Sequence, residues 1–305
     1  MAERFTLRQI EYFVTAGETG SVALAAERLN ISPPSVSAAV AHLEALFGIA
    51  LFIRHHAQGV ALTPEGRRFL AESKRLLATA AELHGLAAGM ANDVRGPLSV
   101  GCLIVLAPLM LPPLRRGFID AHPAVTLSAR AGHQAALIDD LRAARIDIAV
   151  TYDLGLPSDI IFTPLAVLPP RALIPSGHEL AVRDEVSLAE LARLPLLLLD
   201  LPLSRDYLLS LFAAAGLTPR IAERIPDYDL LRSMVANGFG YGLANVRRPP
   251  DTLGLRTLRI SGQPKPVTLG TATARDGAKP RVLTAFEAHC RAAISDHAIP
   301  GMAPP

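Results

Sequence analysis

The residues of this chain that could do nucleophilic or metal chemistry lack the spacing that such chemistry requires. Its two cysteines, Cys102 and Cys290, lie far apart in the sequence, and the neighbours His55 and His56 have no further ligand at metal-binding spacing. The sequence has no Gly-x-Ser-x-Gly nucleophile motif, no His-Glu-x-x-His zinc motif and no Walker phosphate-binding loop. We therefore expect a protein that is not an enzyme, with no catalytic residue, no metal site and no cofactor.

The segment Ser-Pro-Pro-Ser-Val-Ser at residues 32–37 has hydroxyl groups that could hydrogen-bond to the base edges of DNA. Ser32 is suited to cap a helix, and Pro33 fits the first helical position, where its missing N–H costs nothing. An apolar stripe at helical spacing would face inward: Val36, Val40, Leu43 and Phe47. The face left outside is small and polar.

Two helices are predicted before this segment. The first has an apolar stripe that begins at Leu7, and we expect it to end near Gly17. The second is capped by Ser21 and ends at Asn30, a residue type that tolerates the positive φ of a turn. Two short helices joined in this way form a helix-turn-helix, whose second helix can enter a DNA major groove about 12 Å wide.

Residues 51–62 predict a hairpin, because two short apolar segments flank a polar turn. This hairpin would stand beside the helix-turn-helix as a wing. The next helix starts at Thr63 and Pro64, an N-cap followed by a first-position proline. Its apolar and small residues alternate spacings of four and three, the heptad pattern of a helix that pairs with its own copy. The predicted dimer contacts are Phe69, Leu76, Leu83 and Met90.

Residues 5–90 resemble the winged helix-turn-helix and linker helix of the LysR-type transcriptional regulators. Among the matching residues are Leu7, Phe13, Gly20, Ser21, Ala25, Leu29, Ser32, Pro34, Val36, Leu43, Glu44, Gly48, Arg54, Thr63 and Pro64. The resemblance implies a sequence-specific regulator that binds double-stranded DNA as a tetramer, while the heptad seam alone supports a dimer. The residues expected to contact DNA are Ser32, Pro33, Pro34, Ser35, Ser37, His42, Arg54 and Gln58.

The second helix of the helix-turn-helix departs from the family at two positions. Family members commonly have a glutamine and an arginine where this chain has Pro33 and Ala38. Because a bidentate side-chain contact to a base gives about 1–3 kcal/mol of discrimination, fewer long polar side chains predict weaker direct readout. Specificity would then depend on Ser35, Ser37 and His42 and on DNA shape.

The second half of the chain alternates predicted strands and helices, the pattern of a parallel sheet covered by helices. The resemblance implies a two-lobed effector domain, like a periplasmic binding protein, after the linker helix. We therefore expect an α/β fold with an N-terminal winged helix-turn-helix. The predicted division is a DNA-binding domain at 1–66, a linker and dimerisation helix at 67–91, a hinge at 92–97, effector lobe I at 98–165 plus 267–300, and effector lobe II at 166–266.

Ligands of such domains bind between the lobes, beyond the ends of the strands. In the family, small polar residues after the first strand often help to hold an anionic effector. This chain has Cys102, Leu103 and Ile104 there, either as core or as an apolar wall of the site. Ser204 starts a predicted helix and is suited to bind a carboxylate or to act as a simple N-cap. The other candidates are His133, Arg205 and Tyr228.

We expect the effector to be a small organic molecule with an apolar part, for which a carboxylate is one candidate. The chain has 305 residues and a formal charge of +2, which fits a globular protein of two or three domains. Its longest apolar run is interrupted by prolines, and the N-terminus lacks the pattern of a secretory leader, so the expected compartment is cytoplasmic. The alternative is a cytoplasmic solute-binding or sensor protein without specific DNA binding.

The predicted DNA-binding module is not basic, and this sets an expected salt dependence. Through Gly66 it has no lysine, and four arginines stand against six acids: Arg4, Arg8, Arg28 and Arg54 against Glu3, Glu11, Glu18, Glu27, Glu44 and Glu65. Each phosphate that a protein neutralises adds about −0.9 to the slope of log K against log salt concentration. We expect a shallow slope that corresponds to fewer than about ten released counterions. Measuring DNA affinity over a range of salt concentrations checks this, and a steeper slope contradicts it.

Overall fold

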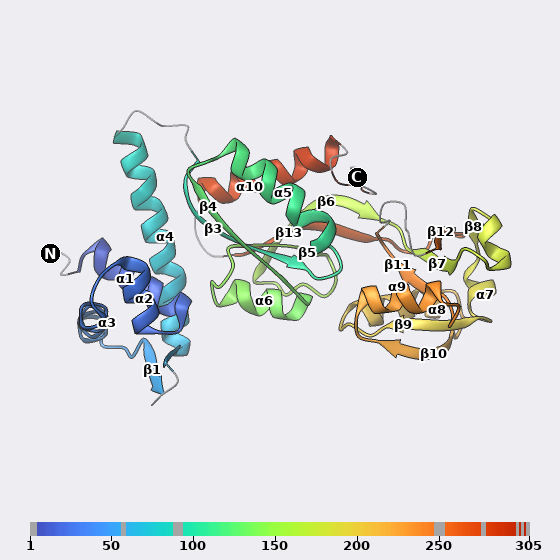
Figure 1. Cartoon of the computed structure of the whole chain (residues 1–305), viewed down its shortest axis with the longest axis horizontal. Coiled ribbons are helices and arrows are strands. Elements are labelled where there is room, and N and C mark those ends of the chain that lie inside the picture. The colour runs from blue at the N-terminus through green and yellow to red at the C-terminus, as the bar shows by residue number, and fades with distance from the viewer. Residues whose placement is uncertain are drawn as a thin grey trace.

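The computed structural model describes residues 5–55, 59–87, 94–246, 254–275, 279–296, 299 and 302. Figure 1 shows a group of N-terminal helices beside the long helix α4, followed by two lobes built of strands and helices. One cluster of buried apolar residues lies in the N-terminal domain, and a second runs through both lobes. Within the described ranges, no helix combines the length and the apolar character needed to cross a membrane.

The N-terminal domain begins with three helices: α1 (Leu7–Thr19), α2 (Val22–Leu29) and α3 (Pro33–Phe47). α1 ends at Gly20, whose φ of 65° makes the left-handed cap, so the predicted end near Gly17 is wrong. Gly17 stays helical and packs closely against Leu70. Asn30 closes α2 with a φ of 54°, which confirms the predicted turn.

One face of α3 packs into the N-terminal domain, and this fixes which face stays outside. Val36, Val40 and Leu43 are at most 4% exposed, in one cluster with Ile10 and Phe13 of α1. Burying a side chain of this size contributes about 1.5–3 kcal/mol, so the rotation of α3 about its own axis is well determined. Ser32, Pro33, Pro34, Ser35, Ala38, Ala41 and His42 are exposed.

The wing is a two-stranded antiparallel hairpin of β1 (Phe52–His55) and β2 (Gly59–Leu62). Two contacts hold it beside the helix-turn-helix. The Glu44 carboxylate accepts hydrogen bonds from the backbone N–H groups of Leu51 (2.8 Å) and Phe52 (3.2 Å). The Val60 N–H donates to the Gly20 carbonyl at 2.9 Å. The wing is therefore tied both to α3 and to the turn before α2.

The linker helix α4 (Pro64–Ala87) shares its first turns with the core of the N-terminal domain. Leu70 is 1% exposed, and the Phe69 ring packs against Phe13 and Phe47, with centroids 5.3 and 4.9 Å apart. Ser73, on the heptad seam, is also buried. Because these contacts lie within one chain, α4 is fixed to the helices that carry α3.

Lobe I is a five-stranded sheet in the order β4-β3-β5-β13-β6. Its strands are β3 (Gly96–Leu103), β4 (Val125–Gly132), β5 (Ile148–Tyr152), β6 (Ile160–Leu168) and β13 (Val267–Ala274). The first three are parallel, and β13 runs antiparallel between β5 and β6. In Figure 1, α5 (Ala107–Ala121) and α10 (Arg281–Ser295) cover one side of the sheet and α6 (Gln134–Arg142) the other.

Lobe II contains a four-stranded sheet, β11-β7-β12-β8, and a parallel pair, β10-β9. Its strands are β7 (Arg171–Pro175), β8 (Glu185–Val186), β9 (Pro195–Leu199), β10 (Arg220–Ile225), β11 (Gly242–Ala244) and β12 (Leu255–Ile260). Its helices are the 3-10 turn η1 (Glu179–Val182), α7 (Leu188–Leu191), α8 (Ser204–Ala214) and α9 (Tyr228–Ala236).

The chain crosses between the lobes twice, and both crossings meet lobe I at the same point of its sheet. β6 continues in the lobe I sheet to Leu168, which pairs with Val267 at the start of β13. The first crossing therefore begins after Leu168, slightly later than the boundary predicted at residue 166. A paired point of this kind can act as a hinge, because the strands beyond it are free to bend together.

We expect Glu44→Ala to destabilise the N-terminal domain, because two backbone N–H groups at the wing would lose their acceptor. The loss should be about 1–3 kcal/mol, visible as a lower unfolding midpoint of this domain in calorimetry of the full chain. Glu44→Gln keeps an acceptor oxygen and should have a smaller effect. Glu72→Ala is the control, since Glu72 is exposed and pairs with Arg75 on the surface of α4. Equal unfolding midpoints for Glu44→Ala and Glu72→Ala would contradict the conclusion that Glu44 holds the wing in place.

Candidate functional site

The outward face of α3 carries most of the residues that the sequence predicts to contact DNA. Ser32, Pro33, Pro34, Ser35 and His42 are exposed, and Ser37 is half-buried. Ser32 occupies the N-cap position but makes no capping bond to the backbone; its hydroxyl lies 2.8 Å from that of Ser35. For Arg54 the structure describes only the backbone, within β1, and Gln58 lies outside the described residues.

A groove of about 340 Å³ lies between α2, α3 and the wing. It places Ser37 of α3 beside Ser21, the N-cap of α2, a residue not among the predicted DNA contacts. Gly59 borders the groove with a φ of 89°, and a Cβ at this position would lie 2.4 Å from the Gly20 carbonyl oxygen. A larger residue would therefore push β2 away from α2 and change the shape of this surface.

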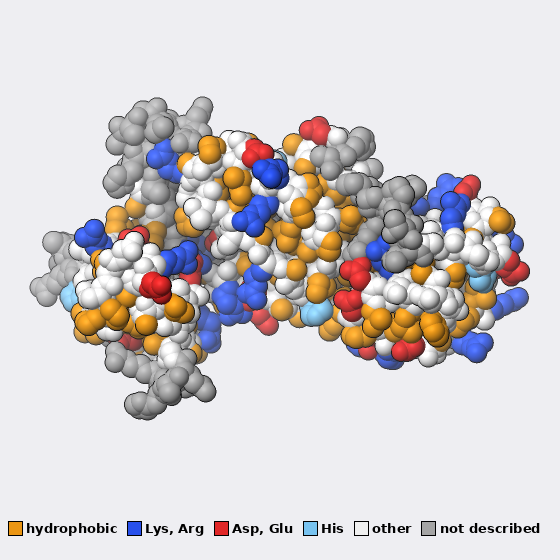
Figure 2. Space-filling model, in the orientation of Figure 1, with side chains coloured by type: hydrophobic (Ala, Val, Ile, Leu, Met, Phe, Trp, Pro, Cys, Tyr) orange, Lys and Arg blue, Asp and Glu red, His pale blue; other side chains and the backbone are white. Residues whose placement is uncertain are grey.

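Two cations of α2 and α4 are partly neutralised within the chain. Arg28 and Lys74 both pair with Glu18 of α1, at 3.6 and 2.9 Å. Figure 2 shows basic and acidic side chains interspersed over the visible face of the molecule. This arrangement agrees with the near-neutral formal charge of +2.

Lys74 also joins the N-terminal domain to lobe I. Its ammonium group donates to the Ala144 carbonyl at 2.9 Å while it pairs with Glu18. Asp147 of lobe I lies nearby and accepts a hydrogen bond from the Ser99 N–H at 2.7 Å. Burial raises the pKa of Asp147, and the charge of Lys74 opposes that rise. Lys74, a residue of α4, thus contacts both α1 and lobe I.

A small cavity of about 30 Å³ lies where the two lobes meet, with room for about two water molecules. Tyr152, at the end of β5, is contributed by lobe I. The remaining lining comes from both sides: Val105, Leu154, Leu199, Ser204, Tyr207, Leu208, Tyr228, Leu243, Ala244, Asn245 and Val246. The site lies beyond the end of a parallel strand, where ligands of α/β sheets usually bind.

Tyr207 and Asn245 connect the cavity to both crossings between the lobes. The Tyr207 hydroxyl donates to the Lys265 carbonyl at 2.8 Å. The Asn245 amide donates to the Tyr207 oxygen at 3.0 Å and to the Leu168 carbonyl at 3.1 Å. Burial raises the pKa of Tyr207 to about 12, so this hydroxyl stays protonated at neutral pH. A ligand that moves Tyr207 would therefore act on the hinge itself.

The start of α8 does not offer the free N–H groups that a carboxylate would need. The Ser204 N–H donates to the Pro202 carbonyl and the Arg205 N–H to that of Leu201, both at 2.8 Å. Leu203, with a φ of 66°, sits at the centre of the first of these bonds, in a rare and strained γ-turn. The prediction that Ser204 binds a carboxylate through its N–H is therefore wrong. Its hydroxyl still lines the cavity.

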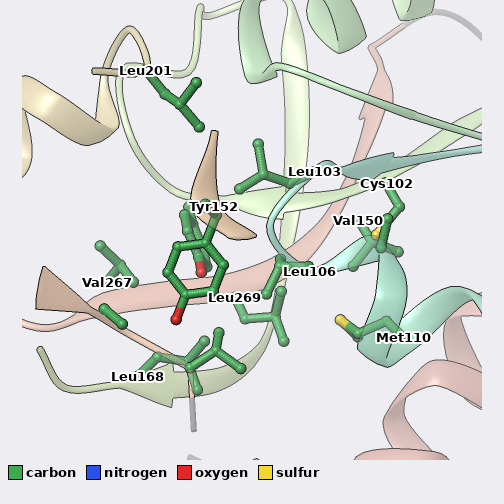
Figure 3. Packing of buried hydrophobic residues seen from close by; sticks show 14 of the residues in the cluster. Cys102, Leu103, Leu106, Met110, Val150, Tyr152, Leu168, Leu201, Val267 and Leu269 are labelled. Atoms are coloured by element: carbon green, nitrogen blue, oxygen red, sulfur yellow. The ribbon is translucent and has the colours of Figure 1, made fainter. Parts of the chain in front are cut away.

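Of the seven predicted effector residues, Ser204 and Tyr228 line the cavity. Cys102 and Leu103 are core residues, 0% and 2% exposed, and Figure 3 shows Cys102 beside Val150 and Met110, away from Tyr152. Burial alone raises the pKa of the Cys102 thiol. Cys102 and Leu103 are therefore core residues and do not form an apolar wall of the effector site.

The other three predicted effector residues point elsewhere. Ile104 is 37% exposed and His133 is exposed, and neither lines the cavity. Arg205 is bound by the carboxylates of Asp200 (2.9 Å) and Asp206 (3.0 Å), outside the lining. The prediction that these three residues contact the effector is wrong, because adjacency in sequence to a site does not determine where a side chain points.

Sequence reasoning missed three polar residues of the cavity, Tyr152, Tyr207 and Asn245. Two of them left a usable signal. Tyr152 is the last residue of β5, at the strand end where ligands of such sheets bind, and Tyr207 lies one helical turn after Ser204 on the same face. Asn245 left none, because its role depends on bonds to Leu168 and Tyr207, which are distant in sequence.

The predicted dimer residues are only partly described. Leu76 is 39% exposed on α4, while the Phe69 ring is already in contact with Phe13 and Phe47. For Leu83 the structure describes the backbone in α4 alone, and Met90 lies outside the described residues. In the described part of the chain, no cluster of three or more His, Cys, Asp or Glu side chains is placed to hold a metal ion.

Comparison with known proteins gives a family match for both halves of the chain. Residues 7–67 match the model of the bacterial regulatory helix-turn-helix proteins of the lysR family, and residues 91–295 match the LysR substrate binding domain. The chain is 32% identical over 252 residues to the HTH-type transcriptional regulator TfdS of Cupriavidus pinatubonensis, which covers 79% of this chain and 84% of that protein.

Solved structures agree with these matches. The LysR family regulator HinK from Pseudomonas aeruginosa is 37% identical, with a TM-score of 0.62 over 94% of this chain and 98% of HinK. The full-length regulator CbnR, crystallised with its target DNA, is 26% identical, with a TM-score of 0.57 over 94% of this chain and 99% of CbnR. The chain belongs to the LysR family of transcriptional regulators, which bind DNA and respond to small-molecule effectors.

Proposed function

We propose that the outward face of α3 lies in the major groove of an operator and reads it through short side chains. The supporting observation is the inward packing of Val36, Val40 and Leu43, which leaves exposed a face of short side chains with serine hydroxyls and one histidine. Ser35, Ser37 and His42 are the proposed base contacts, with Ser32, Pro33 and Pro34 at the start of the helix. Arg54 and Gln58 of the wing are proposed to contact the DNA backbone or the adjacent minor groove.

The protein acts as a homo-oligomer in this proposal, with Leu76, Leu83 and Met90 of the linker helix in the dimer contact. The packing of Phe69 inside its own domain makes it a support for that contact rather than its centre. A paired linker helix would present two copies of α3 to one duplex, as a pseudo-palindromic operator requires.

The effector is proposed to bind in the cavity between the lobes and to act on the hinge through Tyr207 and Asn245. Rotation of one lobe relative to the other then moves the contact of Lys74 with Ala144, and with it α4. A ligand shifts this equilibrium only by its difference in affinity for the two lobe arrangements. We infer no catalytic role for the chain and propose that it works in the cytoplasm, where its DNA target is.

Ala38→Glu should abolish operator binding, because it places a carboxylate on the proposed DNA-facing surface against the phosphates. Alanine and glutamate have similar helix propensity, so folding should be preserved. We expect affinity for the DNA upstream of the protein's own gene to fall by at least about 100-fold in a gel-shift titration. Ala214→Glu makes the same change at an exposed position of α8 and is the matched control. Unchanged affinity in Ala38→Glu would rule out α3 as the reading helix.

A further inference from the structure

The polar groups that line the interlobe cavity in the described chain are uncharged. They are the hydroxyls of Tyr152, Tyr207, Tyr228 and Ser204 and the amide of Asn245, set among aliphatic side chains. Burial and the neighbouring phenols of Tyr228 and Tyr207 raise the pKa of Tyr152. Its hydroxyl therefore keeps its proton and remains both a donor and an acceptor.

Among the residues that the structure describes, the charged groups around the cavity disfavour a bound anion. Arg205 is held between Asp200 and Asp206, which satisfies its charge away from the cavity. The carboxylate of Asp153 lies close enough to Tyr207 to raise the pKa of that phenol further. The first two N–H groups of α8 already donate to Pro202 and Leu201. A ligand carboxylate would therefore meet the negative charge of Asp153 and, at the start of α8, two N–H groups that already have acceptors.

Burial of a charge without a partner costs far more than burial of a hydroxyl or carbonyl that finds a hydrogen bond. We propose that this cavity binds a small uncharged molecule with an apolar body and one or two hydrogen-bonding groups, and that it rejects the corresponding carboxylate. The inference rests on the proposed function, which places the effector here. It excludes the carboxylate, which the sequence left as one candidate.

The size of the cavity adds a condition. The cavity holds only about 30 Å³, so a ligand larger than a few waters must part the lobes or displace side chains. An apolar body is suited to this, because it gains contact with Val105, Leu208 and Leu243 as the space opens. The hydrogen-bonding end of the molecule would lie against the three phenols and Asn245.

Matched probes that differ only in charge test the proposal on the full-length protein. Benzyl alcohol and benzamide are compared with benzoate, and cyclohexanol with cyclohexanecarboxylate, by calorimetric titration. We expect the uncharged member of each set to bind at least about 100-fold more tightly than the carboxylate. A carboxylate that binds as tightly as its neutral partner overturns the proposal, and so does the failure of every uncharged probe to bind. Benzoate binding that depends on Arg247 or Arg248, the cations after Val246 in the sequence, overturns it too.

A second probe can be compared in its neutral and its anionic form by changing the pH alone. 4-Nitrophenol ionises near neutral pH, and only its phenolate absorbs strongly in the visible range. We expect it to bind below its pKa and to be released above it, with a bound spectrum of the protonated form. A bound species with the phenolate spectrum contradicts the proposal.

Cavity variants separate a wrong ligand class from a wrong site. Ala244→Leu and Ser204→Leu each fill the cavity, whereas Ala213→Leu makes the same kind of change on the exposed side of α8. Loss of alcohol binding in the first two, but not in Ala213→Leu, supports the proposal. If the two filling variants abolish benzoate binding instead, the site stands and the ligand class is wrong. If binding survives both, the effector site itself is misplaced.

Discussion

The burial of one face of α3 is the constraint on which the DNA-binding half of the molecule depends. Val36, Val40 and Leu43 can enter the core with Ile10 and Phe13 only at one rotation of the helix. That rotation turns the short side chains outward. Because Glu44, on the same helix, binds the backbone before and within β1, the wing is placed by the same packing. The same contacts thus position both α3 and the wing.

A comparable constraint links the effector half to this unit. Leu168 and Val267 pair where the lobes meet, and Asn245 binds the carbonyl of Leu168 directly. Tyr207 binds the other crossing, so the cavity wall and the hinge share atoms. At the opposite end of lobe I, Lys74 contacts Ala144 from the linker helix. The sheet of lobe I lies between these two contacts, and in the proposed mechanism it carries the movement from the cavity to the linker helix.

Local signals in the sequence predicted most of the N-terminal domain. The N-cap position of Ser32, the turn at Asn30 and the inward stripe of α3 follow from residue type and spacing, and the structure has all three. Phe47 is the exception in that stripe: it is 42% exposed and packs against Phe5 and Phe69 at the domain surface. The α/β alternation of the second half was equally readable, because period and length separate strands from helices.

The effector site was predicted much less well, for a physical reason. Its residues are brought together by contacts between distant segments, such as Asn245 with Leu168, that no local pattern encodes. A strained turn at Leu203 removes the N–H groups that a helix start normally offers. Cys102 lies within β3, one residue before its end, and its side chain points into the core rather than into the cavity.

Methylation protection of operator DNA by dimethyl sulfate tests the central claim most directly. The account predicts protected major-groove guanines in two half-sites about one helical turn, or a multiple of it, apart; protection at a single site, or of minor-groove adenines alone, would contradict it.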